Sequence, residues 1–416
     1  MDGLDKHELL QPAYITKVLD SIYPDPSQYA LTQAVPLVTQ PGDMVTVDVR
    51  HNVGGMTMAV AEGAESPIIA QRGRTQWSFQ PAHFREKYLL GEKDIKAIRK
   101  IGTVSEMETA QQRVTEIVGD LRMRIETRME WAKWQMIYGT LSINQADVLY
   151  TIDYKIPSEF KPTLTGGDAW DTATATPMED LVDWLMLYRD EGTVPEFCQF
   201  NLAIEKIMLM NTDVRALRDS LFTGQPNLGN LTRENIKAVF NAYAGLPYQI
   251  YDKGWYYTVR LDSDIEHDST TFQISENPGI VTNDVVTVVH KTGETRQKLI
   301  LTTVSGTTCT IGAVGGSGVI YPAGSTIRIK KHFLGDDRFI IRGSVPPGTT
   351  GGTNWAEFVA INHVYGPGGL MAPTPGIFTK VIVKNEDDPP RIEVIGGVSG
   401  LPVLYHPTVN VVATVL

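Results

Sequence analysis

The chain has 416 residues, of which 42% are hydrophobic and 20% are charged, and its formal net charge is −11 at pH 7. This length and hydrophobic content provide for two or three domains with buried cores, which excludes a disordered acidic chain. The two cysteines, Cys198 and Cys309, exclude a disulfide scaffold and a cysteine-based zinc site, and the acidic balance argues against a dedicated reader of nucleic-acid sequence.

The N-terminal region, residues 1–45, begins with a short helical pattern that Pro24 and Pro26 end. The rest of it is polar and irregular, which predicts an extended arm. Its first residues lack the basic and apolar segments of a signal peptide, and no stretch of the chain approaches the roughly 20 apolar residues of a membrane helix. We therefore expect a soluble protein that is made inside the cell and has no membrane contact.

Residues 44–60 alternate between apolar and polar side chains, which is typical of a half-buried strand. Gly54 and Gly55 predict a turn in this segment, and the alternation resumes after it. We therefore predict that residues 44–85 form a long two-stranded projection with few contacts of its own.

The strongest predicted element is a long helix over residues 105–139. Ser105 and Glu108 match a capping box, and Gly139 supplies the C-terminal stop. A helix of this length is on the order of 50 Å long, which is typical of a spine that spans a flat, elongated subunit. Apolar residues recur at spacings of three and four along one face of it, namely Val114, Ile117, Val118, Leu121, Ile125, Ala132 and Met136.

Three side-chain arrangements are predicted on this helix. Leu121 and Ile125 belong to its packing face. Arg122 and Glu126, one turn apart, are predicted to pair on the solvent side. The tryptophans Trp131 and Trp134 are interpreted as a packing anchor near the end of the helix instead of a platform for stacking nucleic-acid bases.

The middle of the chain combines helices with a short strand. Helical patterns cover 178–192, 195–211 and 232–245, and the segment LPYQIYD at 246–252 is strand-like. Helices that alternate with short strands favour an α/β or α+β layer.

The composition changes at about residue 262, because residues 262–336 are rich in Thr, Val, Ile and Gly and show no helical pattern. Short strands separated by turns predict a small β-barrel or sandwich, inserted into the α/β-like sequence around it. Its predicted strands cover 284–290, 297–304, 307–314 and 326–331. The end of the chain adds three predicted strands in TKVIVKN, RIEVIGG and TVNVVATVL.

The sequence contains no clear catalytic or cofactor-binding pattern. The glycine-rich stretch GAVGGSG at 312–318 lacks the continuation of a phosphate loop, and no histidine pair places two metal ligands on one face. His332 near Asp336 and Asp337 is the best metal candidate, but aspartates at such positions are more typical of turns. Cys198, between two phenylalanines, is interpreted as core packing. We predict no catalytic, cofactor or metal site, no enzyme activity, and a protein whose function is to assemble.

Three segments carry a resemblance to a known family. RMRIETRMEWAKWQMIYGTLSI at 122–143 resembles the spine-helix signature of the phage major capsid protein E family, the lambda coat-like branch of tailed-bacteriophage capsid proteins. DDPPRIEVIGGVSGLPVLYHP at 387–407 is similar to the C-terminal strand of that family, and QIYDKGWYY at 249–257 is similar to the segment before its apical loops. The resemblance extends over nearly the whole chain apart from the β module.

This resemblance implies an α+β architecture, the HK-ninety-seven-type phage capsid fold, with a small all-β domain inserted. The implied function is that of the major capsid (head) protein of a tailed bacteriophage, which self-assembles into hexamers and pentamers of an icosahedral shell around double-stranded DNA. The implied parts are an N-terminal arm (1–45), an E-loop (46–86), a peripheral domain with the spine helix (87–176), an axial domain (177–261 and 337–370), the β domain that interrupts it (262–336), and return strands of the peripheral domain (371–416).

Two departures from the family refine these expectations. Some relatives join the E-loop to a neighbour by a lysine–asparagine isopeptide bond, but no lysine occurs here between Lys17 and Lys87. We therefore predict a shell without covalent cross-links, in which Arg72 and Arg74 make ionic E-loop contacts with acidic neighbours. The arm is too short for a fused scaffolding domain, which implies a separate scaffolding protein or none.

The resemblance also implies partners and a location. Besides other copies of the chain, the implied partners are a scaffolding protein, a portal and a decoration protein, with non-specific, salt-sensitive contact to packaged DNA. The implied location is the virion capsid, assembled in the host cytoplasm. Membrane contact is not expected.

Other classes stay open from the sequence. An encapsulin-like compartment shell shares the implied fold. A phage tail or adhesion protein, with a β module that binds host sugar, would form trimers or tubes instead of closed shells. A hydrolase that uses scattered carboxylates would need clustered titratable residues in a pocket.

Overall fold

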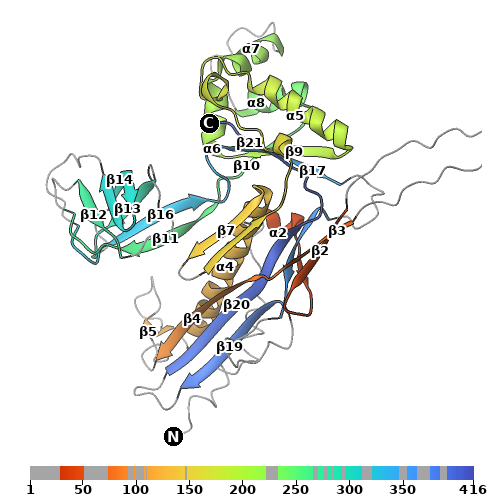
Figure 1. The fold of residues 1–416 in the computed structure, drawn as a ribbon. Helices are drawn as coiled ribbons and strands as arrows, with labels where there is room; N and C mark the ends of the chain where they lie inside the picture. Colours follow the sequence, from red (N-terminus) through yellow and green to blue (C-terminus); the bar gives the residue numbers. More distant parts are fainter. Residues whose placement is uncertain are drawn as a thin grey trace, which may run out of the picture. The chain divides into compact units, whose positions relative to one another are not determined.

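The computed structural model describes residues 29–50, 74–91, 98–99, 107–108, 110–145, 148–221, 233–265, 270–275, 280, 282, 284–292, 296–311, 321–345, 354–362, 375–384 and 391–416. The chain divides into two compact units (Figure 1). Unit 1 comprises Met1–Tyr251 and Asp336–Leu416, and unit 2 comprises Asp252–Gly335.

The longest helix of unit 1 is α4, which covers Ala110–Ile137 and is about 42 Å long. It ends where predicted, because Gly139 takes a φ of +90° and its backbone N donates to Met136 O over 2.9 Å. The predicted start is wrong. Glu108 lies in strand β6 (Met107–Glu108), which pairs with β5 (Ile98–Arg99), so it does not serve as a capping residue of the helix.

The long sheet of unit 1 has the order β1-β18-β20-β19, with β4 pairing to β20 (Figure 1). Its members are β1 (Leu37–Thr39), β4 (Ala82–Gly91), β18 (Ala356–Ala360), β19 (Ile377–Lys384) and β20 (Arg391–Leu404). The spine helix α4 packs against β20 and β4. A second hairpin, β7 (Thr140–Gln145) and β8 (Val148–Asp153), follows directly after that helix.

The second sheet of unit 1 has the order β10-β9-β17-β21. Its strands are β9 (Val194–Phe200), β10 (Tyr248–Ile250), β17 (Arg338–Ser344) and β21 (Val411–Thr414). Its helices are α5 (Pro177–Glu191), α6 (Leu202–Met210), α7 (Thr212–Leu221) and α8 (Arg233–Tyr243). The aromatic rings of Phe200, Phe240 and Phe339 pack together in its core, with centroids 5.3 to 6.5 Å apart. Cys198 is fully buried beside them, as predicted, and burial raises the pKa of its thiol.

Three predicted segment boundaries disagree with the helices and strands observed in unit 1. Residues 29–39 of the predicted arm are attached to unit 1, because Leu31 of helix α2 (Leu31–Ala34) and the following Val35 are buried, and β1 pairs parallel to β18. The segment from Pro195 to Phe200, predicted as helix, is strand β9. The predicted division between 370 and 371 also fails, since β18 joins the long sheet and β21 joins the second sheet. Each of these placements depends on a strand distant in sequence, which a local pattern does not reveal.

Unit 2 is built from strands throughout its described residues. They are β11 (Gly254–Arg260), β12 (Thr271–Gln273), β13 (Val285–Val289), β14 (Arg296–Ser305), β15 (Thr308–Ile311) and β16 (Thr326–His332), in the order β11-β16-β13-β14-β15-β12. The last four of these match the four strands predicted from the sequence. The unit begins at Asp252, not at 262, because β11 pairs with β16 along its whole length.

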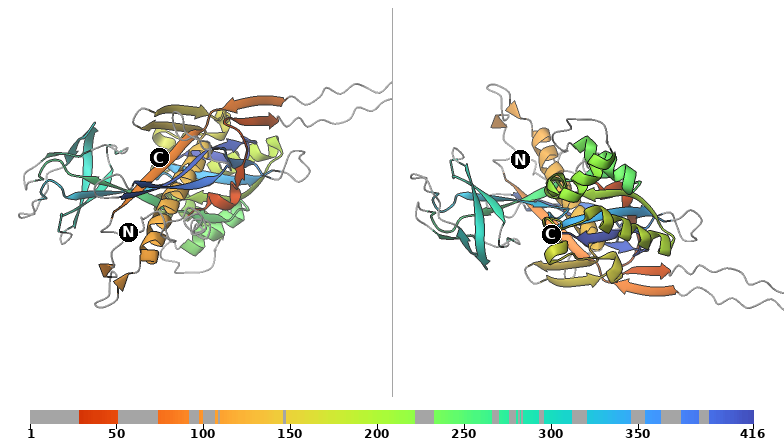
Figure 2. Two further views of the ribbon diagram at one scale, coloured as in Figure 1. Left: turned by 90° about the horizontal axis from the view of Figure 1, so that it is seen from below. Right: turned by 90° about the horizontal axis from the view of Figure 1, so that it is seen from above.

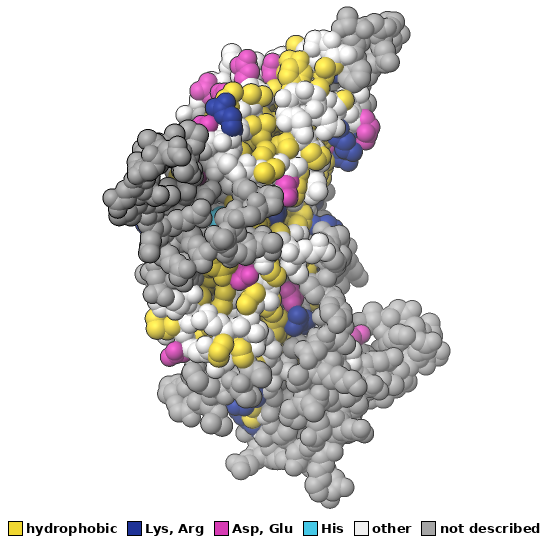
Figure 3. Space-filling view, turned by 90° about the vertical axis from the view of Figure 1, so that its right-hand side faces the viewer, with side chains coloured by type: hydrophobic (Ala, Val, Ile, Leu, Met, Phe, Trp, Pro, Cys, Tyr) yellow, Lys and Arg dark blue, Asp and Glu magenta, His cyan; other side chains and the backbone are white. Residues whose placement is uncertain are grey.

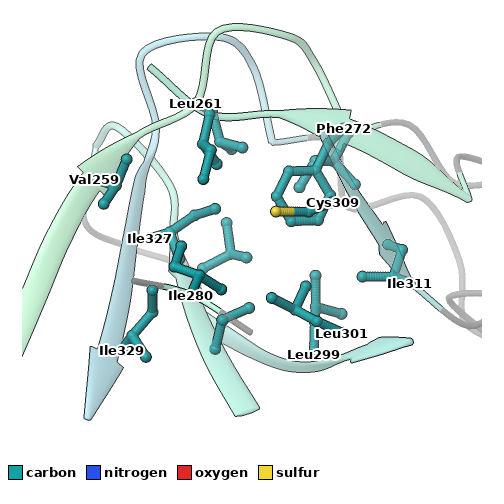
Figure 4. Packing of buried hydrophobic residues seen from close by; sticks show 14 of the residues in the cluster. Val259, Leu261, Phe272, Ile280, Leu299, Leu301, Cys309, Ile311, Ile327 and Ile329 are labelled. Atoms are coloured by element: carbon teal, nitrogen blue, oxygen red, sulfur yellow. The ribbon is translucent and has the colours of Figure 1, made fainter. Parts of the chain in front are cut away.

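The sheet of unit 2 closes on itself. Leu261, just after β11, forms a bridge with Ile274, just after β12, and the backbone N of Asp262 donates to Gln273 O over 2.9 Å. These bonds join the two ends of the strand order into a small barrel, one of the two predicted alternatives. Its interior is filled by aliphatic side chains, Phe272 and Cys309 (Figure 4). That this barrel is an insertion into the family's fold stays a prediction.

Candidate assembly surfaces

The predicted projection contains an antiparallel ribbon of two strands, β2 (Val45–Arg50) and β3 (Arg74–Phe79) (Figure 2). Among the described strands, these two form a sheet of their own. Arg74 is the first residue of β3 and lies opposite Arg50 in the ladder. Arg72 and the predicted turn at Gly54 and Gly55 lie outside the described residues. Ionic contacts from Arg72 and Arg74 stay a prediction.

Three of the four predicted packing residues of α4, Leu121, Ile125 and Trp134, are buried. Leu121 and Ile125 are buried against β20, where a Cβ at Gly396 would lie 3.3 Å from Ile125 Cδ1 and 3.6 Å from Leu121 Cβ. Trp134 is fully buried and stacks on Tyr251 with ring centroids 5.3 Å apart. Trp131 is half-buried, and the Arg128 guanidinium lies 4.3 Å from its ring centroid.

A buried polar cluster, which the sequence pattern did not reveal, surrounds the C-terminal half of α4. Glu130 is 1% exposed, and its Oε1 accepts from Leu31 N and from Trp134 Nε1, each over 3.0 Å. Burial raises the pKa of Glu130 and lowers the pKa of Lys133. The buried Arg342 guanidinium of β17 also acts on Glu130, and burial lowers its own pKa to about 10. The cluster therefore joins α4 to α2 through a hydrogen bond and to the second sheet through charge.

The Arg122–Glu126 pair forms, with 2.6 Å between Nη2 and Oε1, but its predicted location is wrong. Glu126 is 5% exposed, so the pair faces the interior instead of solvent. Glu126 and Glu130 lie four residues apart on the same face as Trp134. This spacing was the sequence signal that could have placed Glu126 on the buried face. The prediction that it faces solvent rested on its charge alone.

Polar contacts hold α4 on β4, and others bind β20 to its neighbours. Arg124 Nη2 donates to Glu86 Oε1 over 3.0 Å, and Tyr88 donates to Asp120. On the other side, Glu393 of β20 lies 3.5 Å from Lys87 Nζ and 3.0 Å from Lys384 Nζ. These pairs link three adjacent strands and the helix, and because most of their side chains are exposed, each contributes little to stability.

Unfolding of the chain is expected to become easier as the pH falls below about 6.5, because two histidines have lowered pKa values in the fold. Burial is the main cause for both His83 and His406, and His83 Nδ1 also lies 2.7 Å from Ser399 Oγ. The unfolded chain, with histidine pKa values near 6.5, then binds more protons than the folded one. The contribution of these two histidines to the free energy of unfolding is therefore fully present above about pH 6.5, and it is lost as the pH falls below that value.

Urea unfolding midpoints at pH 7.5 and pH 5.5 would measure this effect. His83→Gln should reduce the difference between the two pH values, since a neutral amide does not titrate. An equal pH dependence in the variant and the natural chain would remove His83 as a cause.

Exposed apolar side chains mark further surfaces of unit 1. Leu37 and Val38 lie on β1, the edge strand of the long sheet, and Leu89 lies on β4. Met210 at the end of α6 is 63% exposed. On the face drawn in Figure 3, hydrophobic side chains gather between charged ones over the described part of the chain. An unpaired edge strand and exposed apolar side chains are typical of surfaces that a partner covers.

The residues considered for metal binding or catalysis form no cluster in the described part of the chain. In the part of the chain that the structure describes, no group of three or more His, Cys, Asp or Glu could hold a metal ion. His332 has its Nε2 3.5 Å from Asp252 Oδ1, whereas Asp336 and Asp337 occupy a turn. Both cysteines are free and buried, and the glycine-rich stretch at 312–318 lies outside the described residues. The described helices include none with the length and apolarity to cross a membrane.

The sequence matches a known family model, described as phage major capsid protein E, over residues 15–284, which is more than half of the chain. The chain belongs to the phage major capsid protein E family.

Solved structures similar to this capsid protein have low sequence identity to it. A putative prophage capsid protein from E. coli CFT073 shares 14% identity, with 97% of each chain covered and a TM-score of 0.46. The capsid of a native GTA particle shares 10% identity, with 94% of this chain and 91% of that chain covered and a TM-score of 0.42. An encapsulin complex from Synechococcus elongatus shares 10% identity, with 95% and 89% covered and a TM-score of 0.39.

Family membership selects among the classes that the sequence left open. The capsid protein is a structural component of a phage particle, so the compartment-shell and tail-protein alternatives are not favoured. The observed mixture of helices and sheets confirms the α+β expectation.

Proposed function

We propose that this capsid protein builds the icosahedral head of a tailed bacteriophage by associating into hexamers and pentamers that enclose double-stranded DNA. The observation that carries the proposal is the β2–β3 ribbon, whose described strands pair with each other and with no other described strand. A ribbon of two strands is at best marginally stable alone, so a neighbouring subunit is its natural support. The exposed edge of β1 offers a second surface for a neighbour.

The finer parts of the proposal concern partners and place. The shell assembles in the host cytoplasm with a separate scaffolding protein and a portal, and becomes the virion capsid. A net charge of −11 supports weak, non-specific contact with packaged DNA, because an acidic wall does not grip phosphates. As a structural protein it performs no catalysis in this proposal.

Negative-stain microscopy of the purified chain, paired with sedimentation, tests the proposed assembly. Closed polyhedral shells, or rings of five and six subunits, are the expected result. If the chain stays monomeric or trimeric alone and also after co-expression with the neighbouring genes of its phage, the proposed shell is wrong.

The proposed shell is held together without covalent bonds. Because residues 18–86 contain no lysine, the ribbon has no amine for an isopeptide bond. Boiled particles are expected to run on an SDS gel as one band at 46.0 kDa. A ladder of covalent multimers that survives boiling and reducing agent would contradict this prediction.

A further inference from the structure

The outer face of the barrel in unit 2 is cationic and contains no acidic side chain on four adjacent strands. These strands are β11, β16, β13 and β14, and burial alternates along each of them between inward and outward residues. Their sequences include no Asp or Glu. Their basic residues are Arg260, Arg296, Lys298, Arg328, Lys330 and Lys331.

The strand register brings two of these cations onto one exposed row. Arg328 lies opposite Thr287 of β13, and Thr287 lies opposite Lys298 of β14. Two strand spacings therefore separate Arg328 from Lys298, about 10 Å across the sheet. Both side chains are exposed, and neither forms an ion pair with another described residue. On the same face, Lys330 is exposed, with its Nζ 3.7 Å from Asp252 Oδ2.

Large apolar side chains lie among these cations. Tyr256, opposite Lys330, is 66% exposed, and Ile300, opposite Val285, is 61% exposed. Exposed Tyr and Arg beside aliphatic groups are the composition of a protein–protein contact. A site that binds only phosphates would not need the aliphatic pair Val285 and Ile300.

The charge of the chain is unequally divided between its units. Unit 2 contains eight acidic and eight basic residues, so its net charge is zero. The remaining 40 acidic and 29 basic residues, and with them the whole net charge of −11, belong to unit 1. Every copy of the chain therefore carries a strongly acidic unit and a cationic sheet face.

We propose that the outer face of the barrel, defined by Tyr256, Val285, Lys298, Ile300, Arg328 and Lys330, docks on the acidic unit 1 of a neighbouring copy of this chain. The contact reinforces the shell laterally, and so it rests on the proposed function. Charge complementarity supplies its orientation, and the apolar side chains that lie among the cations supply buried area.

The acidic side of this contact is assigned to the region around the start of α5. Residues 162–188 contain Asp168, Asp171, Glu179, Asp180 and Asp183 and no Lys or Arg. Burial is the main cause that raises the pKa of Asp180, and the neighbouring carboxylates raise it further. Glu179 and Asp183 are exposed on α5, so a cationic partner would relieve this repulsion.

The test compares assembled shells of the full chain in four forms. Lys298→Glu with Arg328→Glu reverses the sheet face. Lys253→Glu with Lys291→Glu makes the same charge change at exposed positions of unit 2 outside that face. The fourth form adds Glu179→Lys and Asp183→Lys to the reversed face. Shell disassembly is followed by light scattering on heating, at roughly 0.05 and 0.5 M NaCl, between which screening becomes severalfold stronger.

The reversed face is expected to lower the disassembly temperature at low salt, while the control does not. The difference should shrink at high salt, and the added lysines on α5 should restore the temperature of the natural shell. Equal temperatures for the reversed face and the control would overturn the proposal, as would a loss of packaged DNA with unchanged shell stability. If the reversal weakens the shell and the lysines do not restore it, the assignment to α5 is overturned.

These outcomes are separable from failure of the proposed function. If the natural chain and the Lys253→Glu, Lys291→Glu control form shells, the function stands whatever the reversed face does. Far-UV circular dichroism of unassembled subunits verifies that each form is folded. If the natural chain forms no shell at all, both proposals fall together.

Discussion

Glu130→Ala is expected to destabilise the folded chain by about 3–5 kcal/mol, the range for removing one partner from a buried charged group. The substitution takes the acceptor from two N–H groups, Leu31 N and Trp134 Nε1. It also leaves the buried Lys133 and Arg342 with less compensating negative charge. The segment around α2 would lose the hydrogen bond from Leu31 N to the spine helix, while the bond between Tyr29 Oη and Thr127 Oγ1 would remain.

Urea unfolding of the unassembled chain, followed by far-UV circular dichroism, measures this loss. Asp183→Ala is the matched control, because it removes an exposed carboxylate from another helix and should change stability by less than about 0.5 kcal/mol. Glu130→Gln separates the two causes, since it keeps an oxygen acceptor and removes the charge. A Glu130→Ala midpoint equal to that of Asp183→Ala would show that the cluster contributes nothing.

Gly343→Ala is expected to destabilise the second sheet by about 2–3 kcal/mol, because the added methyl group has no space. A Cβ at this position would lie 2.5 Å from Val409 O, 2.9 Å from Val194 O and 2.7 Å from Tyr188 Cε1. None of these neighbours can move easily. Tyr188 is buried, donates to Ile341 O over 2.7 Å and accepts from Val411 N over 3.1 Å, while the two oxygens belong to the backbone.

Gly167→Ala provides the control for this substitution. Its added Cβ would meet only Thr174 Oγ1, at 3.7 Å, which is an ordinary contact. The same unfolding experiment should therefore show a lower urea midpoint for Gly343→Ala and an unchanged or higher one for Gly167→Ala. Equal midpoints for the two variants would contradict the close packing at Gly343.

Elements with a strong local signal could be predicted from the sequence. The period of α4, its stop at Gly139 and the four strands of unit 2 from Val285 onward depend on residues near each other in the chain. The resemblance to the capsid family indicated the family correctly, and two of its three segments, at 122–143 and 249–257, lie within the residues 15–284 that the family model matches.

Features that depend on distant partners could not be predicted in this way. Strand β21 pairs with β17 in the second sheet, although residues 371–416 were predicted to be return strands of one domain, and β1 is held by β18, more than 300 residues away. The side of α4 on which Glu126 lies was also misjudged, because a charged residue on a helix is usually exposed.

What the sequence determined by itself is therefore the set of local elements, the family and the absence of a clear catalytic motif. Only the tertiary structure decided which strands share a sheet, that the barrel closes through Leu261 and Ile274, and that Lys298 of β14 and Arg328 of β16 lie on one outer face. The physical reason is the same in each case. Backbone pairing and burial are contacts between segments far apart in the chain, and local periodicity specifies which side chains share a face without specifying what that face meets.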